Sequence, residues 1–100
     1  MSGADNATRK AAAMHRQLKR EAKRAAALRP SFINAMQFPA LADLLRAARD
    51  KLFKSRCPDR VRTVRYRGRK YLIEQTIFSR IRVIDPDDGV LLVCGTAFQT

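Results

Sequence analysis

The sequence contains few acidic residues, few cysteines, one histidine and no tryptophan. Its 100 residues include 9 Asp or Glu against 21 Lys or Arg, so the formal net charge is +12. The single histidine, His15, stands among Lys and Arg residues, and no motif places a nucleophile or an acid near it. We therefore expect a protein that is not an enzyme and that needs no cofactor.

Motifs for metal ions and nucleotides are also missing. Cys57 and Cys94 lack the spacing of a zinc motif, and we expect free thiols, with Cys94 a small buried apolar residue. The acidic segment 85–89, DPDDG, lacks the length and the closing Glu of a calcium loop, so it predicts a tight turn. No glycine-rich phosphate loop occurs. The sequence therefore predicts no metal site.

Long hydrophobic runs are absent as well. The clearest apolar stretch, VLLVC at 90–94, is far shorter than the ~20 residues that span a bilayer. Charges interrupt the Ala-rich N-terminal segment, which lacks the hydrophobic region of a signal peptide. We expect a cytoplasmic or nucleoid-associated protein with no membrane partner, and a chain of this length supports one modest core.

Positive charge is concentrated in two separate blocks. Residues 1–30 carry eight basic and two acidic side chains, a net of +6, and residues 60–84 carry eight basic and one acidic, a net of +7. The segment between them is nearly balanced, and residues 85–100 contain three Asp and no basic residue. A function based on charge must therefore account for both blocks.

The first block is expected to form a helix. The residues from 7 to 28 include no Gly or Pro and are mostly good helix formers, which predicts a basic amphipathic helix over 7–29 after a disordered lead-in, 1–6. We expect it to dock weakly or to become ordered only with a partner, because its apolar seam buries little area. A homodimer through the seam is compatible with a helix that binds nucleic acid or an acidic protein partner. The seam consists of Ala11, Met14, Leu18, Ala22 and Ala25.

Residues 30–100 are predicted to form a compact α+β domain. Pro39 suits the first turn of a helix that ends near Lys54. Strand-like alternation then continues to the end of the chain, which predicts a three- to four-stranded antiparallel meander. The fold class is therefore α+β, with two N-terminal helices before the meander.

The strand pattern also predicts a register. A turn with Gly68-Arg69 at its centre would place Tyr66 opposite Tyr71 on the core face, and Arg65 with Arg67 on the other face. The last strand, VLLVCG at 90–95, is apolar on both faces, which is typical of a strand that is central or covered on both sides.

The second basic block is mostly arginine, whose planar guanidinium matches two phosphate oxygens. Crowding such cations on one sheet face costs stability through repulsion, which a polyanion would relieve. We therefore expect a small, non-enzymatic protein that binds DNA or RNA through phosphate contacts. The expected contact residues are Arg65, Arg67, Arg69, Lys70, Arg80 and Arg82 in the strands, with Arg16, Arg20 and Lys23 on the helix as a second line.

Three other interpretations remain open. The basic surface could dock on an acidic protein partner, and apolar residues such as Phe38 and the C-terminal tail would then form the interface centre. The arginines could be a solvated strand face with no ligand. Base stacking on Tyr66 or Tyr71 is a further possibility, although the predicted pairing turns both toward the core and leaves Phe78 as the better exposed aromatic.

Overall fold

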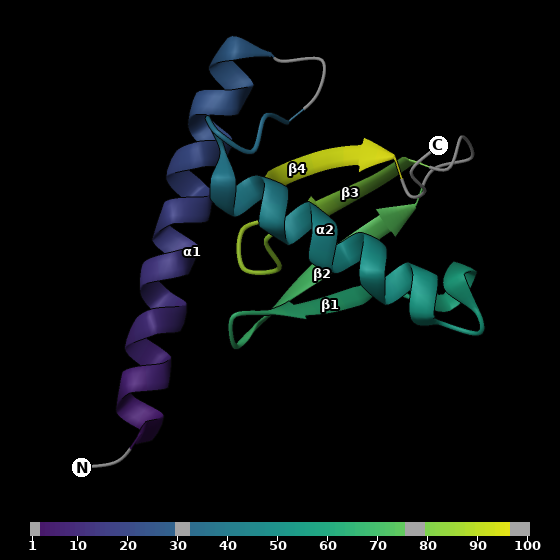
Figure 1. Ribbon diagram of the computed structural model, residues 1–100, viewed down its shortest axis with the longest axis horizontal. Helices are drawn as coiled ribbons and strands as arrows, with labels where there is room; N and C mark the ends of the chain where they lie inside the picture. Colours follow the sequence, from purple (N-terminus) through teal and green to yellow (C-terminus); the bar gives the residue numbers. More distant parts are fainter. Residues whose placement is uncertain (1–2, 30–32, 76–79, 97–100) are drawn as a thin grey trace.

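Two helices precede a four-stranded antiparallel sheet in the computed structural model, which describes residues 3–29, 33–75 and 80–96 (Figure 1). The strands pair in chain order, each antiparallel to the next. This arrangement confirms the α+β fold and the four-stranded form of the meander. The elements are α1 (Gly3–Leu28), α2 (Pro39–Lys54), a short 3-10 helix (Pro58–Arg60), β1 (Thr63–Tyr66), β2 (Arg69–Gln75), β3 (Arg80–Ile84) and β4 (Leu91–Thr96).

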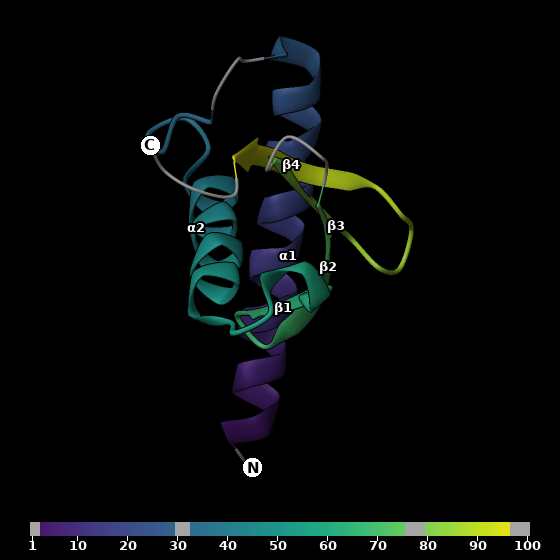
Figure 2. The same ribbon diagram turned by 90° about the vertical axis from the view of Figure 1, so that its right-hand side faces the viewer.

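The helices cover one face and one end of the sheet. α2 lies across one face, and α1 passes the end of the sheet that holds the β1–β2 turn and the β3–β4 loop (Figure 1). No helix in the described ranges covers the other face of the sheet (Figure 2). We call it the open face; the exposed residues that it presents are Arg65, Lys70, Leu72, Glu74, Arg80, Arg82, Leu91 and Cys94.

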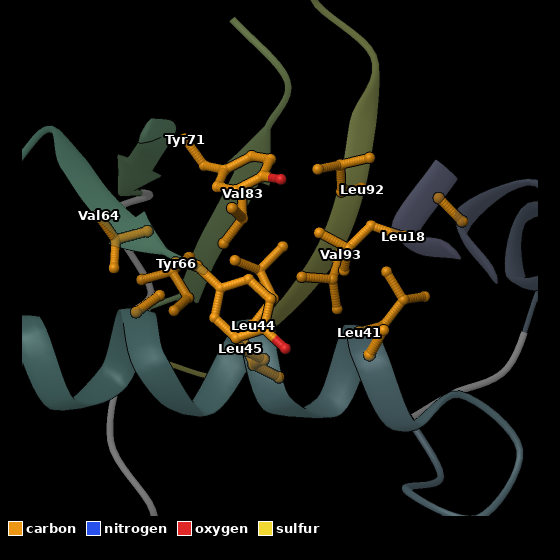
Figure 3. Close-up of a cluster of buried hydrophobic side chains, with 14 of the residues drawn as sticks. Leu18, Leu41, Leu44, Leu45, Val64, Tyr66, Tyr71, Val83, Leu92 and Val93 are labelled. Carbon is orange, nitrogen blue, oxygen red and sulfur yellow. The ribbon is translucent and has the colours of Figure 1, made fainter. Parts of the chain in front are cut away.

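The core lies between α2 and the covered face of the sheet (Figure 3). The predicted apolar face of α2 is buried, with Leu41, Leu44 and Leu52 at its centre. Burying each such side chain contributes about 1.5–3 kcal/mol. Tyr66 and Tyr71 are buried in the same layer, which confirms that both tyrosines point to the core. Neither ring is therefore available for stacking on a base.

α1 packs against this body through the apolar seam that its sequence predicted. Leu18, Ala22 and Ala25 are buried, and Met14 is partly buried against the core. The seam is therefore used within the chain, so a helix–helix dimer would have to compete for it. The helix begins at Gly3, four residues earlier than predicted, and residues 1–2 of the expected lead-in lie outside the described ranges.

A buried glutamate on α1 caps α2. The N-cap position of α2 is Phe38, whose side chain cannot accept a hydrogen bond. Glu21, only 5% exposed, accepts the backbone N–H groups of Ala40 and Leu41 through Oε1, at 3.0 and 3.1 Å. Gln17 donates to its other oxygen at 2.8 Å. A carboxylate is the favoured group at a helix N-terminus, so Glu21 joins the two helices through a charge-assisted cap.

A buried aspartate fixes α1 to the β3–β4 loop. His15 Nε2 lies 3.0 Å from Asp85 Oδ2, and its Nδ1 lies 3.0 Å from the hydroxyl oxygen of Tyr71. Lys19 Nζ donates to the same carboxylate at 3.2 Å and also contacts Asp88. Asp85 is 1% exposed, and its contacts with Lys19 and His15 balance its buried charge. The predicted DPDDG turn thus also serves as the docking point for α1.

The β1–β2 turn starts one residue earlier than the sequence predicted. Arg67 and Gly68 both have positive φ, 51° and 84°, as in a type I′ hairpin turn. Val64 therefore pairs with Tyr71, and Tyr66 pairs with Arg69. The predicted pairing of Tyr66 with Tyr71 is wrong by two residues. Because the shift is even, the paired residues of β1 and β2 keep their predicted faces and the predicted core survives, whereas Arg67 moves from the strand into the turn.

β4 is the outer strand of the sheet, and no helix in the described ranges covers its open face, so the prediction of a strand that is central or covered on both sides is wrong. A register shift at Val83/Ile84 pairs Val83 with Val93 and Ile84 with Leu91. The irregularity leaves Leu92 and Val93 both buried, which explains why the strand reads as apolar on both faces. Cys94, which follows the irregularity, is exposed on the open face and not buried as predicted.

Replacing Glu21 by Ala should lower the free energy of unfolding by about 1–3 kcal/mol, because two buried N–H groups lose their acceptor. Glu21→Gln keeps a side-chain oxygen at the same distance from the backbone and should cost less. Urea unfolding followed by circular dichroism measures both variants. Equal stability of Glu21→Ala and Glu21→Gln would contradict the cap.

Candidate nucleic-acid interface

Four cationic side chains project from the open face of the sheet. Arg65 and Lys70 are exposed cross-strand partners on β1 and β2, next to the turn. Arg80 and Arg82 are exposed on β3, farther from that turn. Within the described residues, no carboxylate lies at ion-pair distance from Arg65, Lys70 or Arg80. These four sequence-predicted residues therefore share one surface.

Arg67 and Arg69 lie elsewhere. Arg67 occupies the turn, where its guanidinium is 3.6 Å from Asp43 of α2 and 5.7 Å from the centre of the Tyr66 ring. Its predicted place beside Arg65 on one face is wrong, because the chain already turns at Arg67. Arg69 stands opposite Tyr66 and pairs with Asp87 of the β3–β4 loop at 2.6 Å. Both guanidiniums thus lie within ion-pair distance of one of the protein's own carboxylates.

One carboxylate and a short apolar row interrupt the open face. Glu74 lies opposite Arg82 in the register, and their charged groups are 3.5 Å apart and about half exposed. An exposed pair of this kind is weak and can be exchanged for a stronger anion. Leu72, Ile84 and Leu91 are successive cross-strand partners, and they form an apolar row between the two cationic pairs.

The cations of α1 form a separate surface. Arg16, Arg20 and Lys23 are exposed on the side of the helix opposite the buried seam. They therefore point away from the body of the protein. The open face and this helix stripe are two distinct basic surfaces, as the two charge blocks of the sequence indicated.

The acidic β3–β4 loop is neutralised within the fold. Asp87 pairs with Arg69, and Asp88 pairs with Lys19. The contact with Lys19, helped by the N–H of Val90, lowers the pKa of Asp88 below its ordinary 3.8. The same contact raises the pKa of Lys19 above 10.5. The loop therefore presents little unbalanced negative charge beside the open face.

A shallow hollow of about 380 Å³ lies between α1, α2 and the end of β1. The hydroxyl of Tyr66 donates to Asp43 Oδ2 there at 2.7 Å, and Arg46 and Arg67 line the same hollow. Burial, followed by the bond to Asp43, raises the pKa of Tyr66 above 10.0. Asp43 accepts the Tyr66 hydroxyl and lies 3.6 Å from the Arg67 guanidinium, so the one described carboxylate that lines this hollow already has partners within the protein.

Comparison with known proteins yields no match to a family model, to a curated protein or to a solved structure. Within the described ranges, no three His, Cys, Asp or Glu side chains are grouped as they would be around a metal ion. The described helices also include none that is long and apolar enough to cross a membrane.

Sequence reasoning missed the residues that position these surfaces. Glu21 and Asp85 were not expected to be buried, although the helix at Pro39 follows Phe38 and so lacks a capping side chain of its own. That missing cap is the signal that could have identified Glu21. The exposed aromatic expected at Phe78 lies outside the described residues.

The contact between Lys19 and Asp88 should make stability depend on pH in a defined direction. Because the pKa of Asp88 is lowered, its ionised carboxylate stabilises the fold at pH values above its ordinary pKa of 3.8. This stabilisation is lost as the pH falls below about 4. The raised pKa of Lys19 adds stability that is lost as the pH rises above 10.5. Asp88→Asn should therefore lower the Tm modestly near neutral pH and converge with the wild type in acid. A Tm difference that grows as the pH falls from 5 to about 3 would contradict the pairing.

Proposed function

We propose that the protein binds nucleic acid through its open face, with phosphate groups as the main contacts and no catalytic step. The observation that carries the proposal is the exposed set Arg65, Lys70, Arg80 and Arg82, which has one carboxylate among four cations. A surface with this balance attracts a polyanion over a longer range than any single ion pair.

The electrostatic repulsion between neighbouring cations of the open face also supports nucleic-acid binding, because a bound phosphate would relieve it. Arg65 and Lys70 are direct cross-strand partners, whose Cβ atoms lie about 5 Å apart, and like charges in such a pair destabilise a sheet. The fold provides no described carboxylate beside them, although it places carboxylates beside Arg67 and Arg69. A phosphate bound between Arg65 and Lys70 would replace repulsion with two charge-assisted hydrogen bonds.

The contacts proposed here favour the backbone of the nucleic acid over its bases. Among the described residues of the open face there is no aromatic side chain, and both described tyrosines are buried. Binding without stacking or base-edge contacts has little dependence on sequence. Arg16, Arg20 and Lys23 would form a second contact line on α1, for a nucleic acid long enough to reach it.

A second candidate is an acidic protein partner. The apolar row of Leu72, Ile84 and Leu91 favours it, because protein interfaces combine an apolar centre with a charged rim. A stoichiometric protein that remains bound after nuclease treatment and a high-salt wash would support this partner. Loss of every partner under that treatment would support nucleic acid.

Binding should weaken steeply with salt. Four phosphate contacts predict that log K falls with log salt at a slope of about −3.6 on duplex DNA. Retardation assays with duplex DNA, single-stranded DNA and RNA across a salt series measure the slope. A flat response, or no retardation of any of the three at low salt, would contradict the proposal.

The double variant Arg65→Gln/Lys70→Gln should make that slope about 1.8 units shallower, because two contacts are lost. The matched control is Lys51→Gln/Lys54→Gln, which removes the same charge from exposed positions on α2, on the covered side of the sheet. This control should leave the slope close to that of the wild type. Equal effects of the two double variants would show that net charge and not the open face governs binding.

A further inference from the structure

The two edge strands of the sheet, β1 and β4, differ in length and in charge. β1, at one side, has four residues, includes the exposed Arg65, and follows the exposed Arg60 and Arg62. β4, at the other side, has six residues, LLVCGT, with no charge and no proline. Natural proteins usually protect an exposed edge with charge, proline or a short strand. β1 is protected in this way and β4 is not.

We propose that β4 pairs with β4 of a second copy of this chain, antiparallel, to form one continuous eight-stranded sheet. Within the described residues β4 has β3 as its neighbour, and the backbone groups on its other side have no strand partner. Pairing with a second copy would give these backbone groups hydrogen-bond partners and make β4 an interior strand. This inference does not depend on the proposed function.

A second copy suits this edge because the edge is neutral in a strongly basic chain. The net charge of +12 makes two copies repel each other on most surfaces. Strands in a sheet are about 4.8 Å apart, so the β3 arginines of two paired copies would be about 14 Å from one another. That separation exceeds the Debye length of about 10 Å at 0.1 M salt, so their repulsion is largely screened.

One exposed residue of β4 serves as the centre of the proposed pairing. After Leu92, which has no partner on β3, the regular part of the strand runs from Val93 to Thr96, and Cys94 is an exposed residue of this part on the open face. We place the two-fold axis, normal to the sheet, at Cys94, so that Cys94 lies opposite Cys94 of the second copy on the open face. Opposed residues in antiparallel strands have Cα atoms about 4.5–5.5 Å apart, within the range of a disulfide.

The test is the mass of the protein in solution, measured by sedimentation in high salt after nuclease treatment, so that nucleic acid plays no part. We expect a dimer of the wild-type chain, and we expect Cys94→Lys to raise its dissociation constant at least ~10-fold, because like charges juxtaposed across an interface cost several kcal/mol. The control, Leu72→Lys on the interior strand β2, adds the same charge to the open face and should leave the dimer intact. A monomer at every concentration, or a dimer unaffected by Cys94→Lys, would overturn the proposal.

A second measurement leaves β4 unchanged and so does not depend on whether Cys94→Lys folds. Mild oxidation of Cys57→Ser, in which Cys94 is the remaining thiol, should give a disulfide-linked dimer of the folded chain. Failure of this cross-link in a sample that sediments as a dimer would show that the copies meet on another surface. Failure of nucleic-acid binding in a dimeric sample would count against the proposed function alone.

Discussion

Two buried carboxylates hold α1 against the rest of the protein, and the arrangement of both basic surfaces depends on them. Glu21 accepts the first N–H groups of α2, and Asp85 receives His15 and Lys19. The apolar seam of α1 consists mostly of alanine, so it specifies the rotation of the helix only weakly. The two carboxylates fix that rotation, because each satisfies groups that would be costly to bury alone. As a result Arg16, Arg20 and Lys23 face solvent and not the sheet.

The positions of the few carboxylates also determine which cations are left for a ligand. Asp43, Asp87 and Asp88 lie near the end of the sheet that α1 passes, where they pair with Arg67, Arg69 and Lys19. Farther along the strands from that end, the open face carries one described carboxylate, Glu74 on β2. The excess charge of the sequence is thus not spread evenly over the molecule. Two groups of exposed cations lie on the open face and on the outer side of α1, and further exposed cations such as Lys51 and Lys54 lie on α2.

Local pattern was sufficient to predict the two helices, the strands and most of the residues that form the core. The leucines of α2 and the alternation of the strands identified the core, because periods of 3.6 and 2 follow directly from backbone geometry. A two-residue error in the β1–β2 register left the core unchanged, since side chains alternate with a period of two. The same error misplaced Arg67. A side chain in the turn points in a different direction from a side chain in the strand, even though the neighbouring strand residues keep their faces.

Long-range pairing could not be predicted from the sequence. Nothing local shows that Glu21 meets the start of α2 or that Asp85 meets His15, because these contacts join residues that are 19 and 70 positions apart in the chain. The place of β4 was also misjudged, and for a related reason. Its composition reflects how much apolar surface it covers, whereas its neighbours are set by the order in which the strands pair.

The character of β4 has a physical consequence for the two basic surfaces. An uncharged edge next to a charged face lets two copies approach along one line while their arginines stay three strand spacings apart. A two-fold axis normal to the sheet keeps both open faces on the same side, so the cations of the two copies would line one extended surface. A polyanion contacting both would gain from each set, as linked binding sites do when the span between them can be bridged. A neutral edge and a charged face are therefore compatible in one sheet. The backbone groups of the β4 edge point along the plane of the sheet toward a second copy, whereas the cationic side chains point out of that plane toward a polyanion.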